Sequence, residues 1–310
     1  MASAETAIPP TMSLRGSAAR RRREAIVRTV LLVAALSSIV ISAFIVYTVA
    51  IEAIDFLRQI DLAWLVDLGW FPRRDMFDVL TLLLGTAMVT GIAMLIAGPI
   101  GLASAIYLSE YATPKTRRTI KPVLEILAGI PSVVLGFFAL TFINPTIVQT
   151  LFEGAPPFTI LAAGIAVGIL SIPLVASVAE DAMRAVPASL REASYGLGAR
   201  RLTTSTRVVV PAAISGIVAA LILATSRAMG ETMVVALAAG ATGGGIRSID
   251  PIAPGQTMTA AMAALATGSD NVVGEYAFQS LFFVGALLFV ITLVLNVIGD
   301  AFVRRARQRY

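Results

Sequence analysis

Cysteine and histidine are both absent from this chain of 310 residues. Without cysteine the chain has no disulfides and no thiolate sites for metal or redox chemistry. Without histidine it lacks the usual general base and the commonest metal ligand. The two lysines, Lys115 and Lys121, do not lie in a G-x-x-x-x-G-K-[ST] loop, so the chain has no P-loop for ATP. We therefore expect no catalytic residues, metal or cofactor in this chain, and any ATP that is used, with its Mg, must be bound by a partner subunit.

Charged residues are also scarce. They make up 14% of the chain, against 57% hydrophobic residues, and the mean hydropathy is +0.85. A soluble domain cannot bury that much apolar surface, so the composition indicates a polytopic membrane protein. The net charge of +5 is then interpreted as a topology signal at the membrane rather than as a nucleic-acid-binding surface.

Six apolar stretches have the length of about 20 residues that a bilayer core requires. These stretches are Val27–Ile51, Val79–Ser109, Pro122–Ile143, Phe158–Ala179, Val208–Ala239 and Tyr276–Val303. The sequence thus predicts an all-α membrane protein with six transmembrane helices. The predicted divisions are a basic tail (1–26), the first helix (27–52), an extracytoplasmic loop (53–78), the main transmembrane domain (79–303) and a second basic tail (304–310).

Lysine and arginine are distributed unevenly between successive loops. The N-terminal tail, loop 110–121, loop 180–207 and the C-terminal tail hold six, four, five and four, whereas the intervening loops hold three, none and one. Because basic loops stay in the cytoplasm, both termini are predicted to be cytoplasmic. The run Arg20–Arg23 before the first apolar stretch also fits a cleaved signal peptide, but the stretch is too long for one, which favours an uncleaved span.

One basic residue, Arg227, falls near the middle of a predicted span, and Glu231 follows four residues later. On a continuous helix the two side chains share a face. They either form an ion pair that locks helix packing or line a polar path, in which an arginine suits an anion because it stays charged. Glu125, near the cytoplasmic end of the predicted third span, is a second candidate for a charged residue on the path. Alternatively, its side chain extends to the membrane surface and has no such role. Helix breakers at 129–132, 171–173 and 230–232 predict interrupted helices along such a path.

The longest polar stretch between two apolar spans runs from Pro187 to Pro211. It is predicted to form a short helix, a glycine turn and a second short helix, in place of a solvated loop. Its spacing, with Glu192-Ala193-Ser194, then Gly198, then Val208-x-Val210-Pro211, resembles the E-A-A-x3-G-x9-I-x-L-P signature of ABC-importer permeases. Ser194, Val208 and Val210 replace the signature's Ala, Ile and Leu.

Three further segments look like the permeases of the high-affinity phosphate importer: Ala128–Gly136, Glu192–Gly198 and Arg227–Met233. The similarity extends from about Val79 to the end. Of the two permease types in that system, PstC and PstA, the residues around Glu125 and Met233 look more like PstC. The segment 256–266, predicted as a short interfacial or re-entrant helix, departs from the family because it lacks an acidic residue often found near its end.

This resemblance implies a type I ABC-importer permease in a bacterial plasma membrane. The implied partners are a homologous second permease (PstA-like), two ATPase subunits (PstB-like) and an extracytoplasmic phosphate-binding protein (PstS-like). The segment 187–206 would supply coupling helices, with a turn allowed by Gly196 and Gly198. The implied ATPase-coupling residues are Leu190, Glu192, Ala193, Leu197, Gly198 and Leu202, and the implied substrate-path residues are Arg227, Glu231, Thr232 and Ser132.

Other functions remain open from the residues alone. A permease of the same fold for another oxyanion, sulfate or molybdate, would carry the same coupling segment. A secondary transporter or channel would work without an ATPase and would tolerate changes at Glu192 or Gly198. An intramembrane enzyme is disfavoured, because the chain has no histidine, no cysteine and no paired aspartates within its spans.

Overall fold

The computed structural model describes residues 18–66, 69–240, 245–267 and 275–306. Contacts divide the chain into two units, 1–48 and 49–310. Helix α1 (Ala18–Gln59) contains the predicted first span and is exposed throughout residues 22–46. The basic residues Arg20–Arg23 are therefore already helical, whereas residues 1–17 of the predicted tail lie outside the described residues.

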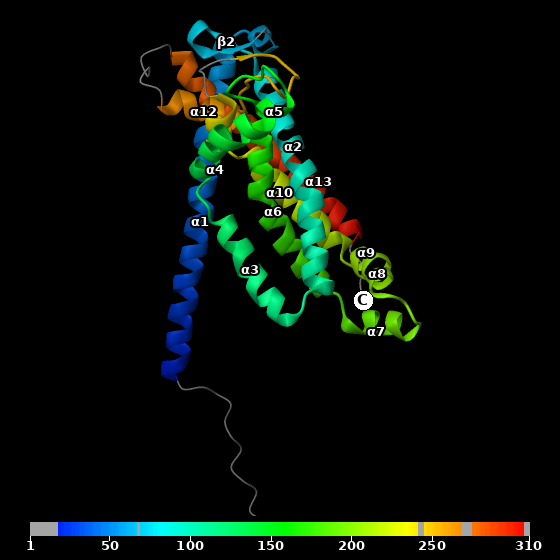
Figure 1. Cartoon of the computed structure of the whole chain (residues 1–310). Coiled ribbons are helices and arrows are strands. Elements are labelled where there is room, and N and C mark those ends of the chain that lie inside the picture. The colour runs from blue at the N-terminus through cyan, green and yellow to red at the C-terminus, as the bar shows by residue number, and fades with distance from the viewer. Residues whose placement is uncertain (1–17, 67–68, 241–244, 268–274, 307–310) are drawn as a thin grey trace, which may run out of the picture. The chain divides into compact units, whose positions relative to one another are not determined.

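The second unit is built mainly from helices (Figure 1). Up to the start of α6 its elements are η1 (Leu62–Val66), β1 (Gly69–Phe71), η2 (Pro72–Arg74), β2 (Met76–Phe77), α2 (Val79–Ile106), η3 (Tyr107–Tyr111), α3 (Pro114–Ala128), α4 (Ser132–Phe138), η4 (Ala139–Val148) and α5 (Gln149–Leu151). The remaining elements are α6 (Ile160–Arg184), α7 (Ala188–Gly196), α8 (Arg201–Thr204), η5 (Ser205–Val209), α9 (Val210–Ala212), α10 (Ile214–Met229), α11 (Met233–Val235), η6 (Ala236–Gly240), β3 (Gly245–Ile246), α12 (Met258–Thr267) and α13 (Glu275–Ala306).

Five helical stretches within the described residues are long and apolar enough to cross a membrane, and a bent pair of helices makes a sixth. The five are Arg22–Gln59, Val79–Tyr111, Ser132–Leu151, Ile160–Arg184 and Tyr276–Arg305. The pair Arg201–Ala212 and Ile214–Met229 is bent by 71°. The helical membrane fold predicted from the sequence is thus confirmed, with six spans if the bent pair is counted as one.

The predicted third span is wrong at its start. Pro122 lies inside α3, an amphipathic helix without buried residues, and the spanning stretch begins only at Ser132 and runs to Leu151. The helix is interrupted between Ala128 and Ser132, because Gly129, Ile130 and Pro131 are not helical. Pro131 has no N–H to donate and restrains the residue before it, so α3 cannot continue into α4.

The break expected at Pro173 is also wrong. Helix α6 runs without interruption through Pro173, and the buried Ser171 hydroxyl donates to the Val167 carbonyl within the same helix at 2.8 Å. The break expected at Gly230 is present, because α10 ends at Met229 and α11 starts at Met233. The predicted fifth span is therefore not one helix.

A small antiparallel sheet, in the order β2-β1-β3, joins the predicted 53–78 loop to residues after α11. The sequence predicts helices throughout and gives no signal for these strands, which are only two or three residues long. The fully buried Asp78 caps α2 through the Leu80 amide and also binds Arg247 beside β3, with Nη2 2.8 Å from Oδ1. Two distant loops are thereby tied together.

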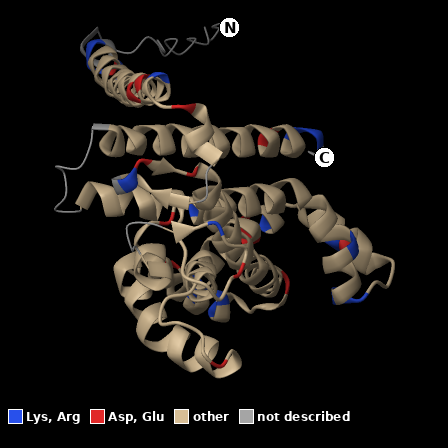
Figure 2. Ribbon diagram, turned by 90° about the horizontal axis from the view of Figure 1, so that it is seen from above, with Lys and Arg blue, Asp and Glu red and all other residues tan. Residues whose placement is uncertain are grey.

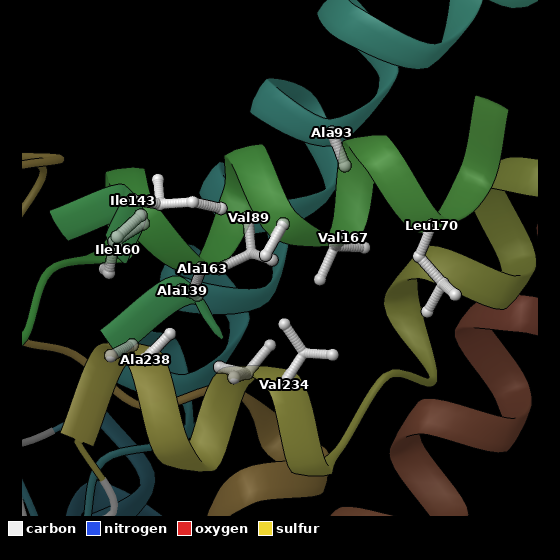
Figure 3. Packing of buried hydrophobic residues seen from close by; sticks show 14 of the residues in the cluster. Val89, Ala93, Ala139, Ile143, Ile160, Ala163, Val167, Leu170, Val234 and Ala238 are labelled. Atoms are coloured by element: carbon white, nitrogen blue, oxygen red, sulfur yellow. The ribbon is translucent and has the colours of Figure 1, made fainter. Parts of the chain in front are cut away.

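The largest buried apolar cluster lies between α2, α6, η4 and the α11–η6 segment (Figure 3). Val89 and Ala93 of α2 face Ala163 and Val167 of α6, and Val234 lies across from them. Most of these residues are alanine or valine, which lets the helices approach closely. Gly164 shows the same constraint, because a Cβ there would lie 2.7 Å from the Ile92 side chain. This packing fixes α11 and η6 against the spans.

Candidate transport path and coupling segment

Two interrupted helices lie side by side within the spans. Helix α4 begins at Ser132 after the first break, and α11 begins at Met233 after the second. They touch at Gly136, where a Cβ would meet the Met233 carbonyl oxygen and the Val234 Cα, each at 3.0 Å. Gly136 is therefore required for the close approach. Both helix starts place backbone N–H groups at the breaks, which favours negative charge there.

The two broken helices run in the same direction. Asn144 of η4 donates to the Pro156 and Pro157 carbonyls and accepts from the Thr159 hydroxyl just before α6. At the end of η6, the Ala238 carbonyl accepts from the Thr159 amide. The far ends of η4 and η6 thus meet at the start of α6. Because Gly136, and not Ser132, lies against Met233, the break before Ser132 lies about one helical turn beyond the break before Met233.

Glu231 lies in the second break, between α10 and α11. Its carboxylate accepts from the Val234 amide at 3.5 Å, at the start of α11. Its carbonyl accepts from the Thr259 hydroxyl of α12 at 2.7 Å. The neighbouring Thr232 hydroxyl donates to the Gly230 carbonyl at 3.3 Å. The conformation of the break is thus stabilised by hydrogen bonds within residues 230–234 and by one hydrogen bond from α12.

Arg227 lies in the last turn of α10 and is exposed. Its side chain makes no hydrogen bond or ion pair among the described residues, including Glu231. Of the two alternatives left open by the sequence, the ion pair is not formed, because the helix ends at Met229 and Glu231 no longer follows the helical repeat. Its neighbour Ser226 donates to Asn296 of α13 at 3.2 Å. The charged guanidinium of Arg227 is therefore exposed on α10, one of the two bent helices that together are long and apolar enough to cross a membrane.

Sequence reasoning missed a set of polar residues at the start of α12. The Met258 amide donates to the Thr86 hydroxyl of α2 at 3.0 Å, and the Thr257 and Thr259 hydroxyls are 3.2 Å apart. Gln256 is only 2% exposed. A Cβ on Gly85 would lie 2.1 Å from the Gln256 carbonyl oxygen. The predicted short helix is present as α12 (Met258–Thr267), and its start packs against α2. Three hydroxyl residues in an apolar region, Thr86, Thr257 and Thr259, were the available signal.

The polar segment after α6 forms the predicted pair of short helices, α7 and α8. Gly198 supplies the turn with φ of 78°, a left-handed conformation that glycine adopts without strain. Gly196 instead ends α7 and has no positive φ. Across the turn, the Ser194 and Thr204 hydroxyls lie 2.9 Å apart. The two helices thus form a defined unit and not a solvated loop.

Most of the predicted coupling residues point outward. Glu192, Ala193, Leu197 and Leu202 are exposed, and Leu197 is 90% exposed although it is apolar. Leu190 differs, because it packs against the buried cluster that contains Met183 and Val186. It supports the segment from within and does not belong to the exposed surface. Glu125 and Ser132 lie elsewhere, on α3 and at the start of α4.

Arg191 anchors α7 to the spans. Its guanidinium donates to the Glu110 carboxylate in η3 at 3.0 Å, to the Met183 carbonyl at 2.8 Å and to the Val186 carbonyl at 2.7 Å. Glu110 is buried. In addition, the Arg201 guanidinium of α8 lies 5.5 Å from the ring centre of Tyr111. Both short helices are thus fastened to η3, the end of the α2 span.

Comparison with known proteins places this geometry among transporters. A family model described as "Binding-protein-dependent transport system inner membrane component" matches residues 97–309. The phosphate transport system permease protein PstC of Mesorhizobium japonicum is 31% identical, covering 100% of this chain and 99% of that protein. The probable ABC transporter permease protein YqgH of Bacillus subtilis is 39% identical over 58% of each chain.

Solved structures show the same fold at low sequence identity. A chain of a bacterial ABC transporter involved in the import of the acidic polysaccharide alginate aligns with a TM-score of 0.63 at 15% identity, over 93% of this chain and all of that one. A chain of the inward-facing methionine ABC transporter MetNI aligns with a TM-score of 0.55 at 19% identity, over 74% and 94%. The expected type I importer permease fold is confirmed.

Proposed function

This chain belongs to the family of binding-protein-dependent transport system inner membrane components, and we propose that it is one permease of an ATP-driven importer of inorganic phosphate. Its relatives over 88–100% of the chain include proteins named as phosphate permeases of the PstC type. The proposed location is the bacterial plasma membrane. The alternative cargoes, sulfate and molybdate, have no specific support in this chain.

Arg227 is the observation that carries the proposed cargo. An arginine at membrane depth is costly, by about 2.5–3.5 kcal/mol on insertion scales. This one is exposed, and it has no partner within the described part of the chain. It therefore suits a face that lines a polar path between two subunits, where it offers an anion a fixed charge. Glu231, held in the adjacent break, partly offsets that charge, so the anion is not trapped.

The proposed assembly has a homologous second permease, PstA-like, across from Arg227. Two PstB-like ATPase subunits bind ATP and Mg below the membrane. A PstS-like protein delivers phosphate from outside. The exposed apolar side chains Leu197 and Leu202 supply the contact with the ATPase. Movement of α7 and α8 then reaches the α2 span through Arg191 and Glu110.

Transport by this complex follows alternating access. ATP binding draws the ATPase subunits together, and the attached short helices move with them. The path opens outward and receives phosphate, and hydrolysis returns it to the inward state. The breaks before Ser132 and Met233 bring helix starts to this path, and Thr232 adds a hydroxyl beside Glu231. No step of ATP chemistry takes place in this chain.

The test is phosphate uptake by the reconstituted complex carrying Arg227→Gln. We expect uptake to fall at least about tenfold, while the complex still assembles and hydrolyses ATP. Arg305→Gln serves as the control, because Arg305 is also exposed but lies in the last turn of α13, outside both breaks and the coupling segment. Undiminished uptake by the Arg227 variant would rule out the path assignment. Uptake of sulfate or molybdate in preference to phosphate would overturn the cargo.

A further inference from the structure

A basic pocket lies on the side of the molecule that holds α3, far along the chain from Arg227. Its volume is about 360 Å³. The lining residues are Pro114, Arg117, Arg118, Lys121, Pro122, Glu125 and Arg184. Four of these seven side chains are cationic and one is a carboxylate. Figure 1 shows α3 beside the lower part of α6, from which Arg184 comes.

Cations of the pocket contact a buried carboxylate that does not itself line the pocket, Glu180 of α6, which is 0% exposed. Lys121 Nζ lies 2.8 Å from Glu180 Oε2 and 2.6 Å from Asp181 Oδ1. Arg117 Nε lies 3.4 Å from Glu180 Oε1. Burial lowers the pKa of Lys121, but the hydrogen bonds to Asp181 and Glu180 outweigh that effect and leave it above its ordinary value. These contacts hold α3 in place.

The other two cations of the pocket are held less firmly. Arg118 is exposed, and its side chain has no hydrogen bond or ion pair within the ranges that the structure describes. Arg184 is half exposed and keeps only one contact, 3.7 Å from Glu180. Two guanidinium groups therefore remain available at the mouth of the pocket. A guanidinium presents paired N–H groups that match the oxygens of a phosphate.

The pocket lies at the end of the spans. Arg117 donates to the Leu108 and Ser109 carbonyls, where the α2–η3 stretch ends at Tyr111. Lys121 binds the last turn of α6. Basic residues occupy the first two turns of α3, and beyond them Val123, Ile126 and Leu127 are exposed, Ile126 to 70%. The helix thus presents charge at the ends of the spans and apolar side chains towards the start of α4.

We infer that this pocket binds an anionic phospholipid, with its phosphate against Arg118 and Arg184 and an acyl chain along Val123, Ile126 and Leu127. A free anion would need only the charges. The exposed apolar side chains on the same helix favour a ligand that is itself amphiphilic. Figure 2 shows that Lys, Arg, Asp and Glu occupy few segments of the ribbon, so a group of four cations is a local feature.

The experiment uses the whole complex in nanodiscs of phosphatidylcholine that contain or lack phosphatidylglycerol. Lipids retained after mild extraction are quantified by mass spectrometry. The double variant Arg118→Gln/Arg184→Gln is expected to retain phosphatidylglycerol roughly tenfold less well than the unaltered complex. The control Lys115→Gln/Arg305→Gln removes the same charge from exposed residues that do not line the pocket, and should retain the lipid normally.

Three results would overturn the inference. Equal loss in both variants would mean that only net charge matters. Displacement of phosphatidylglycerol by excess inorganic phosphate would identify a site for a free anion. Loss of the ATPase subunit from the double variant, without loss of lipid, would identify a protein contact. Since the readout is lipid retention, it is independent of whether the complex transports phosphate.

Discussion

Arg191 of α7 donates a hydrogen bond to Glu110 of η3 at 3.0 Å, across 81 residues of sequence. The same guanidinium donates to two carbonyls at the end of α6. One side chain thus links the short helix to two spans. In the proposed coupling role the segment has to transmit displacement without flexing, and this joint would supply the stiffness that two short helices alone lack.

Replacing Arg191 with methionine should separate ATP hydrolysis from transport. The change leaves Glu110 buried without its cation, and breaking such a pair costs about 3–5 kcal/mol. We expect a lower Tm and a drop in phosphate uptake of at least about tenfold, with ATP hydrolysis retained. Arg305→Met is the matched control, because Arg305 is also exposed but lies outside the 187–211 segment. Normal coupling in the Arg191 variant would show that the joint is not needed.

Leu197 and Leu190 should behave in opposite ways when each is replaced with serine. Leu197 is 90% exposed, so its loss should leave Tm unchanged and weaken retention of the ATPase subunit during purification. Leu190 packs against the buried cluster around Met183. Its loss should reduce the free energy of unfolding by about 1–3 kcal/mol, because packing contacts are removed, and should therefore lower Tm. If Leu197→Ser retains the ATPase fully, the exposed leucine is not part of the contact.

Gly136→Ala should disturb the two broken helices. The added Cβ would lie 3.0 Å from the Met233 carbonyl oxygen and from the Val234 Cα. Both are backbone atoms, so the clash cannot be relieved by a change of side-chain rotamer. We expect α4 and α11 to be forced apart, with a lower Tm and slower uptake. Gly91→Ala provides the control, because a Cβ on Gly91 meets nothing within 4 Å. Similar Tm values for the two variants would contradict the packing described for α4 and α11.

Local chemistry explains why some site residues were predictable. Gly198 was identified as a turn because glycine tolerates a positive φ, and the structure has φ of 78° there. The break at Gly230 was also predicted, yet its consequence for Arg227 was not, since the i, i+4 rule holds only on a continuous helix. Pro173 was a false signal. Proline removes one hydrogen bond, and the packing around α6 keeps the helix continuous.

The amino-acid sequence by itself determined that the chain is a helical membrane protein, where its longest polar segment between two spans lies and that it has no P-loop. Hydropathy, charge distribution and residue spacing are local properties, so no tertiary contact is needed to interpret them. Only the tertiary structure decided that α3 lies outside the third span, that Leu190 faces inward, and that Arg191 binds Glu110. These outcomes depend on which surfaces meet. The segment from Pro187 to Pro211 was recognisable from its sequence, but its attachment to η3 required contacts between residues far apart in the chain.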